Sequence, residues 1–134
     1  MVDVHPPPED YVERLSRIAA ALPEAHQEDA WRGVRWRIRT QTFAHTLVIV
    51  DGTPTSYATA ARTDGPTTVL TFRAAGDELL FFRQAGPPYF SPAAWEDLAG
   101  MVLDADTDWS EVAEVVTESY RLRAPRRLAQ LLDD

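Results

Sequence analysis

The sequence predicts an α+β fold in which helices pack on one face of an antiparallel sheet of about five strands. Three observations support this prediction. Apolar residues recur at helical spacing near both ends of the chain, they alternate with polar residues over much of positions 34–73, and Gly, Pro and Asp separate the alternating segments. The 134 residues, 45% of them hydrophobic and none of them cysteine, can bury a core without disulfides. We therefore expect a single domain over residues 1–134.

The first elements are a helix and a two-stranded hairpin. Pro8 suits the first turn of the helix, and Pro23 ends it. Its apolar face consists of Tyr11, Leu15, Ile18, Ala19 and Leu22. We predict a polar connection over 23–33, a strand over 34–39 and, after a tight reversal, a second strand over 42–50. Alternation places Val34, Trp36 and Ile38 on one side of the first strand and Arg35, Arg37 and Arg39 on the other.

The remaining elements follow from turn signals and periodicity. We predict strands over 56–61, 67–73 and 100–103, and a helix over 76–84. Residues 89–95 are expected to form a loop or a short helical turn. Asp108 and Glu111 match a capping box that begins a helix, and Pro125 begins the last one. The buried side of the capped helix consists of Trp109, Val112, Ala113, Val116 and Tyr120.

The charge distribution limits the class of partner. A net charge of −8 and a pI near 4.8 disfavour a general nucleic-acid binder, since duplex affinity is largely phosphate neutralisation. Two segments are nevertheless basic: 32–73 holds six arginines against two aspartates, and 121–134 holds four against two. No apolar run approaches the roughly 20 residues of a membrane span, and the first residues have no signal-peptide core. We expect a cytoplasmic protein.

The arginines of the first basic segment are the best candidate site. Arg32, Arg35, Arg37 and Arg39 have no acidic residue between positions 30 and 50, so that their guanidinium groups can bind phosphates. The alternative, which the default for antiparallel sheets favours, is a solvated strand face whose arginines pair with acids. Arg126 and Arg127 are a second candidate, because cations are unfavourable in the first turn of a helix and suggest a partner, an anion or a contact with the acidic middle of the chain. The alternative, which the default favours, is that they contribute only to surface electrostatics.

Aromatic residues offer a different kind of site. Trp31, Trp36, Tyr89 and Phe90 can line a groove for a small molecule or a peptide, in which aromatic side chains serve as anchors. The alternative is that they belong to the core or its rim.

Enzymatic and metal chemistry have little support in the sequence. It contains no nucleophile elbow, P-loop or dinucleotide fingerprint, and we expect no catalytic residues and no cofactor. Asp104, Asp106 and Asp108 resemble the start of an EF-hand loop, but Trp109 and Val115 occupy the positions that require Gly and Glu. The histidines have no metal-ligand spacing, and we expect His45 to be half-buried and hydrogen-bonded.

Several short motifs occur together along nearly the full chain. They are Leu22-Pro23-Glu24-Ala25, Trp31 and Phe43-Ala44, then Pro88-Tyr89-Phe90, Trp95, Met101-Val102-Leu103-Asp104, Asp108-Trp109 and Glu118-Ser119-Tyr120. Their order and spacing resemble the MmcQ/YjbR family. The resemblance implies a twisted antiparallel sheet backed by helices, similar to the bacterial frataxin CyaY. It also implies DNA binding, since that fold is likened to a double-wing DNA-binding domain, although a fold does not fix a function.

Two details limit what this resemblance implies. Gln41 stands where members of the family often have a lysine, so any ligand contact made by that lysine is lost or altered here. Frataxins bind iron along an acidic ridge of the first helix and strand. Here the helix offers only Glu9, Asp10 and Glu13 and the following strand is basic, which disfavours iron.

Taken together, these observations favour a non-enzymatic binding module, monomeric or weakly dimeric. The leading hypothesis is a basic β-hairpin that contacts an anionic partner, with DNA the partner that the resemblance implies. The alternative is an adaptor that binds a protein or a small ligand in the aromatic groove and does not bind nucleic acid.

Overall fold

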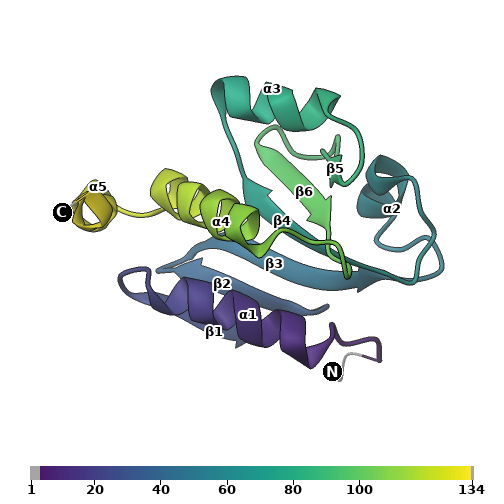
Figure 1. Cartoon of the computed structure of the whole chain (residues 1–134), viewed down its shortest axis with the longest axis horizontal. Helices are drawn as coiled ribbons and strands as arrows, with labels where there is room; N and C mark the ends of the chain where they lie inside the picture. Colours follow the sequence, from purple (N-terminus) through teal and green to yellow (C-terminus); the bar gives the residue numbers. More distant parts are fainter. Residues whose placement is uncertain (1–3, 134) are drawn as a thin grey trace.

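A computed structural model describes residues 4–133 as an antiparallel sheet of six strands with α-helices around it (Figure 1). The strand order is β1-β2-β3-β4-β6-β5. The strands are β1 (Ala25–Asp29), β2 (Val34–Ile38), β3 (Gln41–Ile49), β4 (Thr67–Arg73), β5 (Tyr89–Phe90) and β6 (Leu98–Val102). The helices are α1 (Glu9–Ala20), α2 (Thr55–Ala61), α3 (Gly76–Gln84), α4 (Trp109–Arg123) and α5 (Arg126–Gln130), followed by a 3-10 turn at Leu131–Asp133. The predicted α+β class is confirmed, with six strands in place of about five.

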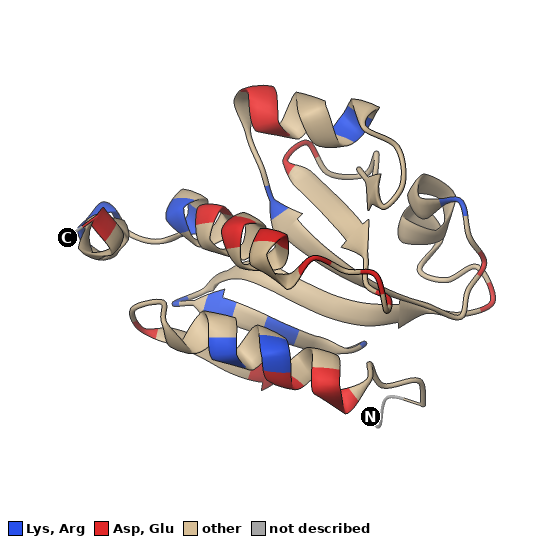
Figure 2. Ribbon diagram, in the orientation of Figure 1, with Lys and Arg blue, Asp and Glu red and all other residues tan. Residues whose placement is uncertain are grey.

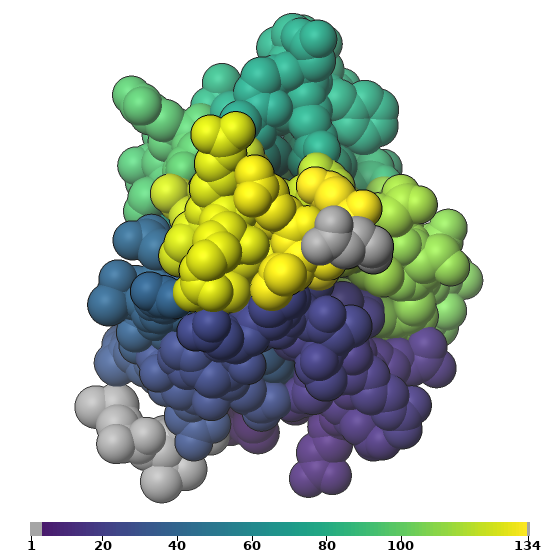
Figure 3. All heavy atoms as spheres, turned by 90° about the vertical axis from the view of Figure 1, so that its left-hand side faces the viewer, coloured from purple at the N-terminus to yellow at the C-terminus, as the bar shows by residue number. Residues whose placement is uncertain are grey.

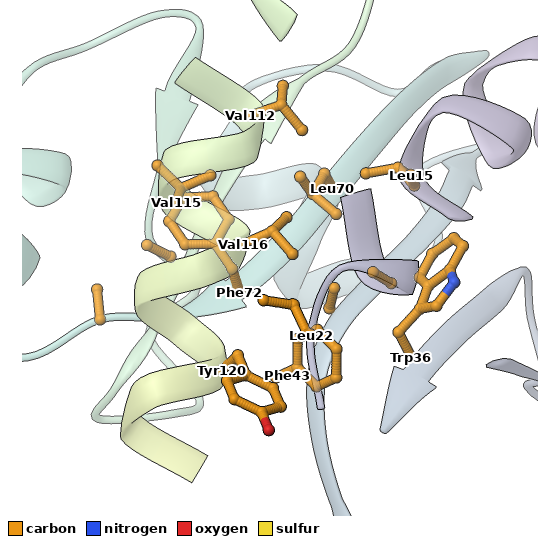
Figure 4. Close-up of a cluster of buried hydrophobic side chains, with 14 of the residues drawn as sticks. Leu15, Leu22, Trp36, Phe43, Leu70, Phe72, Val112, Val115, Val116 and Tyr120 are labelled. Atoms are coloured by element: carbon orange, nitrogen blue, oxygen red, sulfur yellow. The ribbon is translucent and has the colours of Figure 1, made fainter. Parts of the chain in front are cut away.

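The main core lies between the sheet and the two longest helices, α1 and α4. Val112, Val116 and Tyr120 of α4 point toward the sheet, where they meet Leu70 and Phe72 of β4 (Figure 4). The apolar stripe predicted for the first helix is also buried here, with Leu15 and Trp36 on the α1 side of the cluster. Burial of these side chains is the main source of stability on this face.

A β-bulge in the β2–β3 hairpin decides which face several residues occupy. Trp36 is opposite Ala44 but Arg37 is opposite Thr42, so that Phe43 is an extra residue in β3. Both Phe43 and Ala44 therefore join the main core, and Phe43 packs edge-on against Tyr120 with 5.5 Å between ring centroids. Strict alternation predicts that Phe43 shares a face with His45 and Leu47. The bulge is the reason why it does not.

Helix α2 covers part of the opposite face, so the prediction that the helices pack on one face of the sheet is wrong for α2. Leu70 belongs to the main core, whereas its neighbour Val69 belongs to a second cluster with Tyr57 and Ala58 of α2. Since successive residues of a strand point to opposite faces, this second cluster lies behind the sheet. The sheet is thus covered on both faces at the β4–β6–β5 end. Over β1, β2 and the start of β3, the helices pack only on the core side.

Three local predictions were wrong. Residues 25–29 form the edge strand β1 and not a polar connection, because an edge strand needs backbone pairing more than an apolar face. Residues 55–61 form helix α2 and not a strand, because two turns are too short to show a helical period. Tyr89 and Phe90 pair with β6 as the short strand β5. The other predicted elements are confirmed, including the capping of α4 by the Asp108 side chain.

Two polar side chains fix α4 to the rest of the fold. The buried Ser119 hydroxyl donates to the Phe43 carbonyl at 2.6 Å and accepts from the Arg73 amide at 2.7 Å, so it joins β3 to β4. The Tyr120 hydroxyl donates to the Pro23 carbonyl at 2.6 Å. A packed tyrosine usually finds such a partner for its hydroxyl. No helix among residues 4–133 is long and apolar enough to cross a membrane.

Candidate functional site

The part of the sheet that no helix covers carries a polar array, which we call the uncovered face. Register pairs Glu28 with Arg35, Arg35 with His45, and His45 with Thr71, so these four side chains form a row across β1, β2, β3 and β4. Arg73 lies two residues beyond Thr71 on the same side of β4. A second row pairs His26, Arg37 and Thr42. In Figure 2, arginines mark β2 and the end of β4, whereas acidic residues follow α4 and the loop before it.

Glu28 is the counterion of two arginines. Its Oε1 accepts from Arg35 Nε and, at 3.3 Å, from Arg37 Nη1. The hydrogen bond from Arg35 is the largest cause that holds the pKa of the Glu28 carboxyl below its usual value, and the charge of Arg37 acts in the same direction. The side chains of Arg35 and Arg37 stay 37% and 23% exposed. Both guanidinium groups therefore still reach solvent.

A second carboxylate is shared in the same way. Asp97, which precedes β6, accepts from Arg73 at 2.9 Å through Oδ1 and from Arg123 of α4 through Oδ2. Arg35, Arg37, Arg73 and Arg123 thus pair with only two carboxylates, Glu28 and Asp97. Within this set two positive charges are left over, which is the arrangement that attracts an anion.

A small cavity of about 100 Å³ opens where the uncovered face meets α2. Its polar lining comes from Thr42, His45, Tyr57, Thr71 and Arg73. His45 Nε2 lies 2.6 Å from the Arg32 carbonyl; because a carbonyl only accepts, the assigned tautomer carries its proton on Nε2. Burial lowers the pKa of His45, and the Arg35 charge adds to this against the opposing effect of the hydrogen bond. The expectation of a half-buried, hydrogen-bonded His45 is confirmed.

The predicted arginine site is only partly assembled. Arg35 and Arg37 lie side by side on β2, but Arg32 donates to the Thr53 carbonyl at 2.7 Å and its guanidinium lies 5.4 Å from the Trp31 ring. Arg39 sits in the hairpin turn with a positive φ of 56° and lies 3.6 Å from Glu24. The four arginines therefore do not form one continuous stripe.

Arg126 and Arg127 lie apart from the uncovered face, at the start of α5. This helix packs on the core side through Leu128. In Figure 3 the C-terminal segment lies across the end of the molecule, between the N-terminal elements and α3. Both arginines are exposed, and neither forms an ion pair with any residue in the described part of the chain.

The predicted aromatic groove does not form. Trp36 is 2% exposed in the main core, and Phe90 is 4% exposed in the second cluster. Trp31 is exposed beside β2, whereas Tyr89 belongs to β5 at the other edge of the sheet. The prediction failed because similar residue types were grouped without a strand order that could bring them together.

Sequence reasoning missed Thr71, Arg73, Tyr57 and Asp97. A signal was present for two of them, since alternation along 67–73 places Thr71 and Arg73 on one side of that strand. Tyr57 was hidden by the wrong assignment of α2. Asp97 lies 26 residues from Arg123, and no local pattern shows that the two meet.

A comparison with protein families agrees with the order of motifs in the chain. The family model described as YjbR matches residues 20–122. The chain belongs to the YjbR family. The match extends from the end of α1 to near the end of α4, so that the whole sheet of this YjbR protein lies inside it and Arg126 and Arg127 lie outside. No curated protein matches the chain.

Proposed function

We propose that this YjbR protein is a non-enzymatic binding module that holds the phosphate backbone of DNA against its uncovered face. The observation that carries the proposal is the shared pairing of four arginines with two carboxylates. A phosphate that approaches Arg35 and Arg37 meets partly exposed guanidinium groups that Glu28 already holds, and the Thr40 carbonyl holds Arg37 as well. Their alignment reduces the side-chain entropy that binding would otherwise cost.

The polar neighbours of these arginines suit the same partner. The half-buried Thr42 adds a hydroxyl donor, and hydroxyl groups contribute to phosphate contacts in many protein–DNA interfaces. Such contacts fix position and carry no sequence information, so we propose binding without strong sequence preference. The acids of α4 lie on the other side of the sheet, where they oppose the phosphates less than their number suggests.

The test is fluorescence anisotropy of a labelled random-sequence duplex at about 50 and 200 mM salt. We expect binding at the lower salt concentration that weakens at the higher one and is lost in the variant R35A/R37A. The matched control is R14A/R17A, which removes the same charge from α1 on the covered side. The variant R126A/R127A measures any contribution from α5.

Two results would contradict the proposal. One is absence of binding by the wild-type protein at the lower salt concentration. The other is an equal loss of affinity in R35A/R37A and R14A/R17A, because a general charge effect would then explain the binding without the uncovered face. Circular dichroism of each variant separates a binding defect from a folding defect.

A further inference from the structure

A second cavity lies at the β5 edge of the sheet. Its volume is about 560 Å³, within the range of small-molecule sites. It is enclosed by the end of α2, the end of α3 and the segment that contains β5, which come together at the right-hand side of Figure 1. We call it the β5 cavity.

The charge of the β5 cavity is opposite to that of the protein. Arg62 and Arg83 line it, and no Asp or Glu does, although the chain has a net charge of −8. Arg83 donates to the Glu96 carbonyl at 2.8 Å, which holds its guanidinium in place and leaves other N–H donors available. Arg62 is exposed, and its side chain makes no hydrogen bond or ion pair to another described residue.

Most of the remaining wall residues are apolar, and Gln84 and Ser91 add polar groups. Pro87, Pro88 and Pro92 contribute rigid backbone, and Tyr89 and Phe90 contribute rings. Tyr89 is itself packed against Phe82, with 5.1 Å between ring centroids. Such walls lose little conformational entropy when a ligand binds.

We propose that the β5 cavity binds a small organic anion, a carboxylate or sulfonate with an apolar body, whose charged group pairs with Arg62 and Arg83. The apolar body lies against the prolines and the Tyr89 ring. This site is separate from the uncovered face and takes a different class of ligand. It accounts for two of the four aromatic residues that the sequence suggested for a groove, Tyr89 and Phe90, without Trp31 and Trp36.

The edge of the sheet favours a small molecule over an extended peptide. Addition of a peptide strand requires a row of free backbone N–H and C=O groups. Strand β5 has only two residues, and Pro87, Pro88 and Pro92 beside it have no N–H to donate. The recognition groups that the cavity does offer are side chains, which suit a compact ligand.

The test compares 2-naphthoate with 2-naphthamide, a neutral molecule of nearly the same shape, by titration of the ¹⁵N-labelled protein. We expect 2-naphthoate to shift the amide signals of Ala60, Ala61, Gly86 and Ser91 saturably, with a Kd below about 1 mM. We expect at least a tenfold weaker interaction for 2-naphthamide and for the variant R62G/R83Q. Arg62 has a φ of 57°, a conformation that favours glycine, so Arg62→Gly keeps the end of α2 intact. The variant R126Q/R127Q is the control for overall charge.

The proposal is overturned if 2-naphthoate causes no saturable shift at these amides. Equal affinities for the acid and the amide, or an unchanged affinity in R62G/R83Q, overturn it as well. These results are independent of DNA binding, because R62G/R83Q leaves Arg35 and Arg37 intact and R35A/R37A leaves the β5 cavity intact.

Discussion

Removal of the shared counterion Glu28 should strengthen the binding of DNA. Glu28 pairs with both Arg35 and Arg37, as Asp97 pairs with Arg73 and Arg123. These four arginines and two carboxylates together have two positive charges in excess. Glu28→Gln keeps the shape of the side chain and raises the excess to three. Affinity for a duplex falls with salt with a logarithmic slope of about −0.9 for each phosphate neutralised. The slope should therefore change from about −1.8 in the wild-type protein to about −2.7 in the variant.

These slopes give a measurable difference. Between about 50 and 200 mM salt, affinity should fall roughly 12-fold for the wild-type protein and roughly 40-fold for Glu28→Gln. At the lower concentration the variant should bind more tightly. The assay is the anisotropy titration already described, with Glu13→Gln as the matched control, since Glu13 pairs with Arg17 on α1 and its loss changes the net charge equally.

One outcome would refute this reasoning. If Glu28→Gln and the wild-type protein have the same affinity and the same salt slope, phosphates do not contact Arg35 and Arg37. The strand would then be a solvated face whose arginines pair only with acids, as the alternative interpretation of the sequence holds.

Three further predictions concern stability. Ser119→Ala leaves the Arg73 amide and the Phe43 carbonyl without the hydroxyl that joins them, so the free energy of unfolding in urea should fall by about 3 kcal/mol. Gly33 has a φ of 76°, and a Cβ at this position would lie 1.9 Å from the Thr46 carbonyl oxygen. Because of this clash, Gly33→Ala should lower the melting temperature more than an alanine substitution at an exposed helical site. The pKa of His45 is lower in the folded state, so the unfolded state binds more protons below about pH 6.5. The free energy of unfolding should therefore fall as the pH drops below about 6.5, by at most about 1.4 kcal/mol per pH unit. His45→Gln should remove that dependence in urea titrations across this pH range.

The sequence was sufficient where a periodic pattern met a buried surface. Alternation in 34–38 correctly placed Trp36 and Ile38 in the core and Arg35 and Arg37 on the other side, because a one-residue slip would bury the arginines. Helix α4 was predicted with its N-cap because Asp108 and the apolar side of the helix agree. Strand β1 was missed because its residues are almost all polar and no periodic signal remains at an edge that is solvated on one face.

The candidate site depended on this missed strand. Glu28 lies seven residues before Arg35 in the chain, and it becomes its counterion only because β1 folds back on β2 in one register. An acidic segment before a basic strand, with Gly33 between them, was a usable signal for that hairpin. The pairing of Asp97 with Arg73 and Arg123 depends on three separate elements, and only the folded chain brings them together.

The separation of charge between the two sides of the sheet has a consequence for DNA binding at low salt. Helix α4 and the loop before it hold six acidic residues, and the core and the sheet separate them from the uncovered face. A sheet and the layer packed on it are about 10 Å apart, close to the Debye length at 0.1 M salt, so these acids are largely screened there. At about 0.01 M the Debye length is roughly 30 Å, and the whole net charge of −8 then repels the duplex. Affinity should therefore fall below the line extrapolated from 50–200 mM when the anisotropy titration is repeated at about 10 mM. The affinity of a basic protein would continue along that line. If the affinity of this protein does so as well, its acids do not act on the bound duplex. The separation of charge between the two sides of the sheet would then have no part in DNA binding.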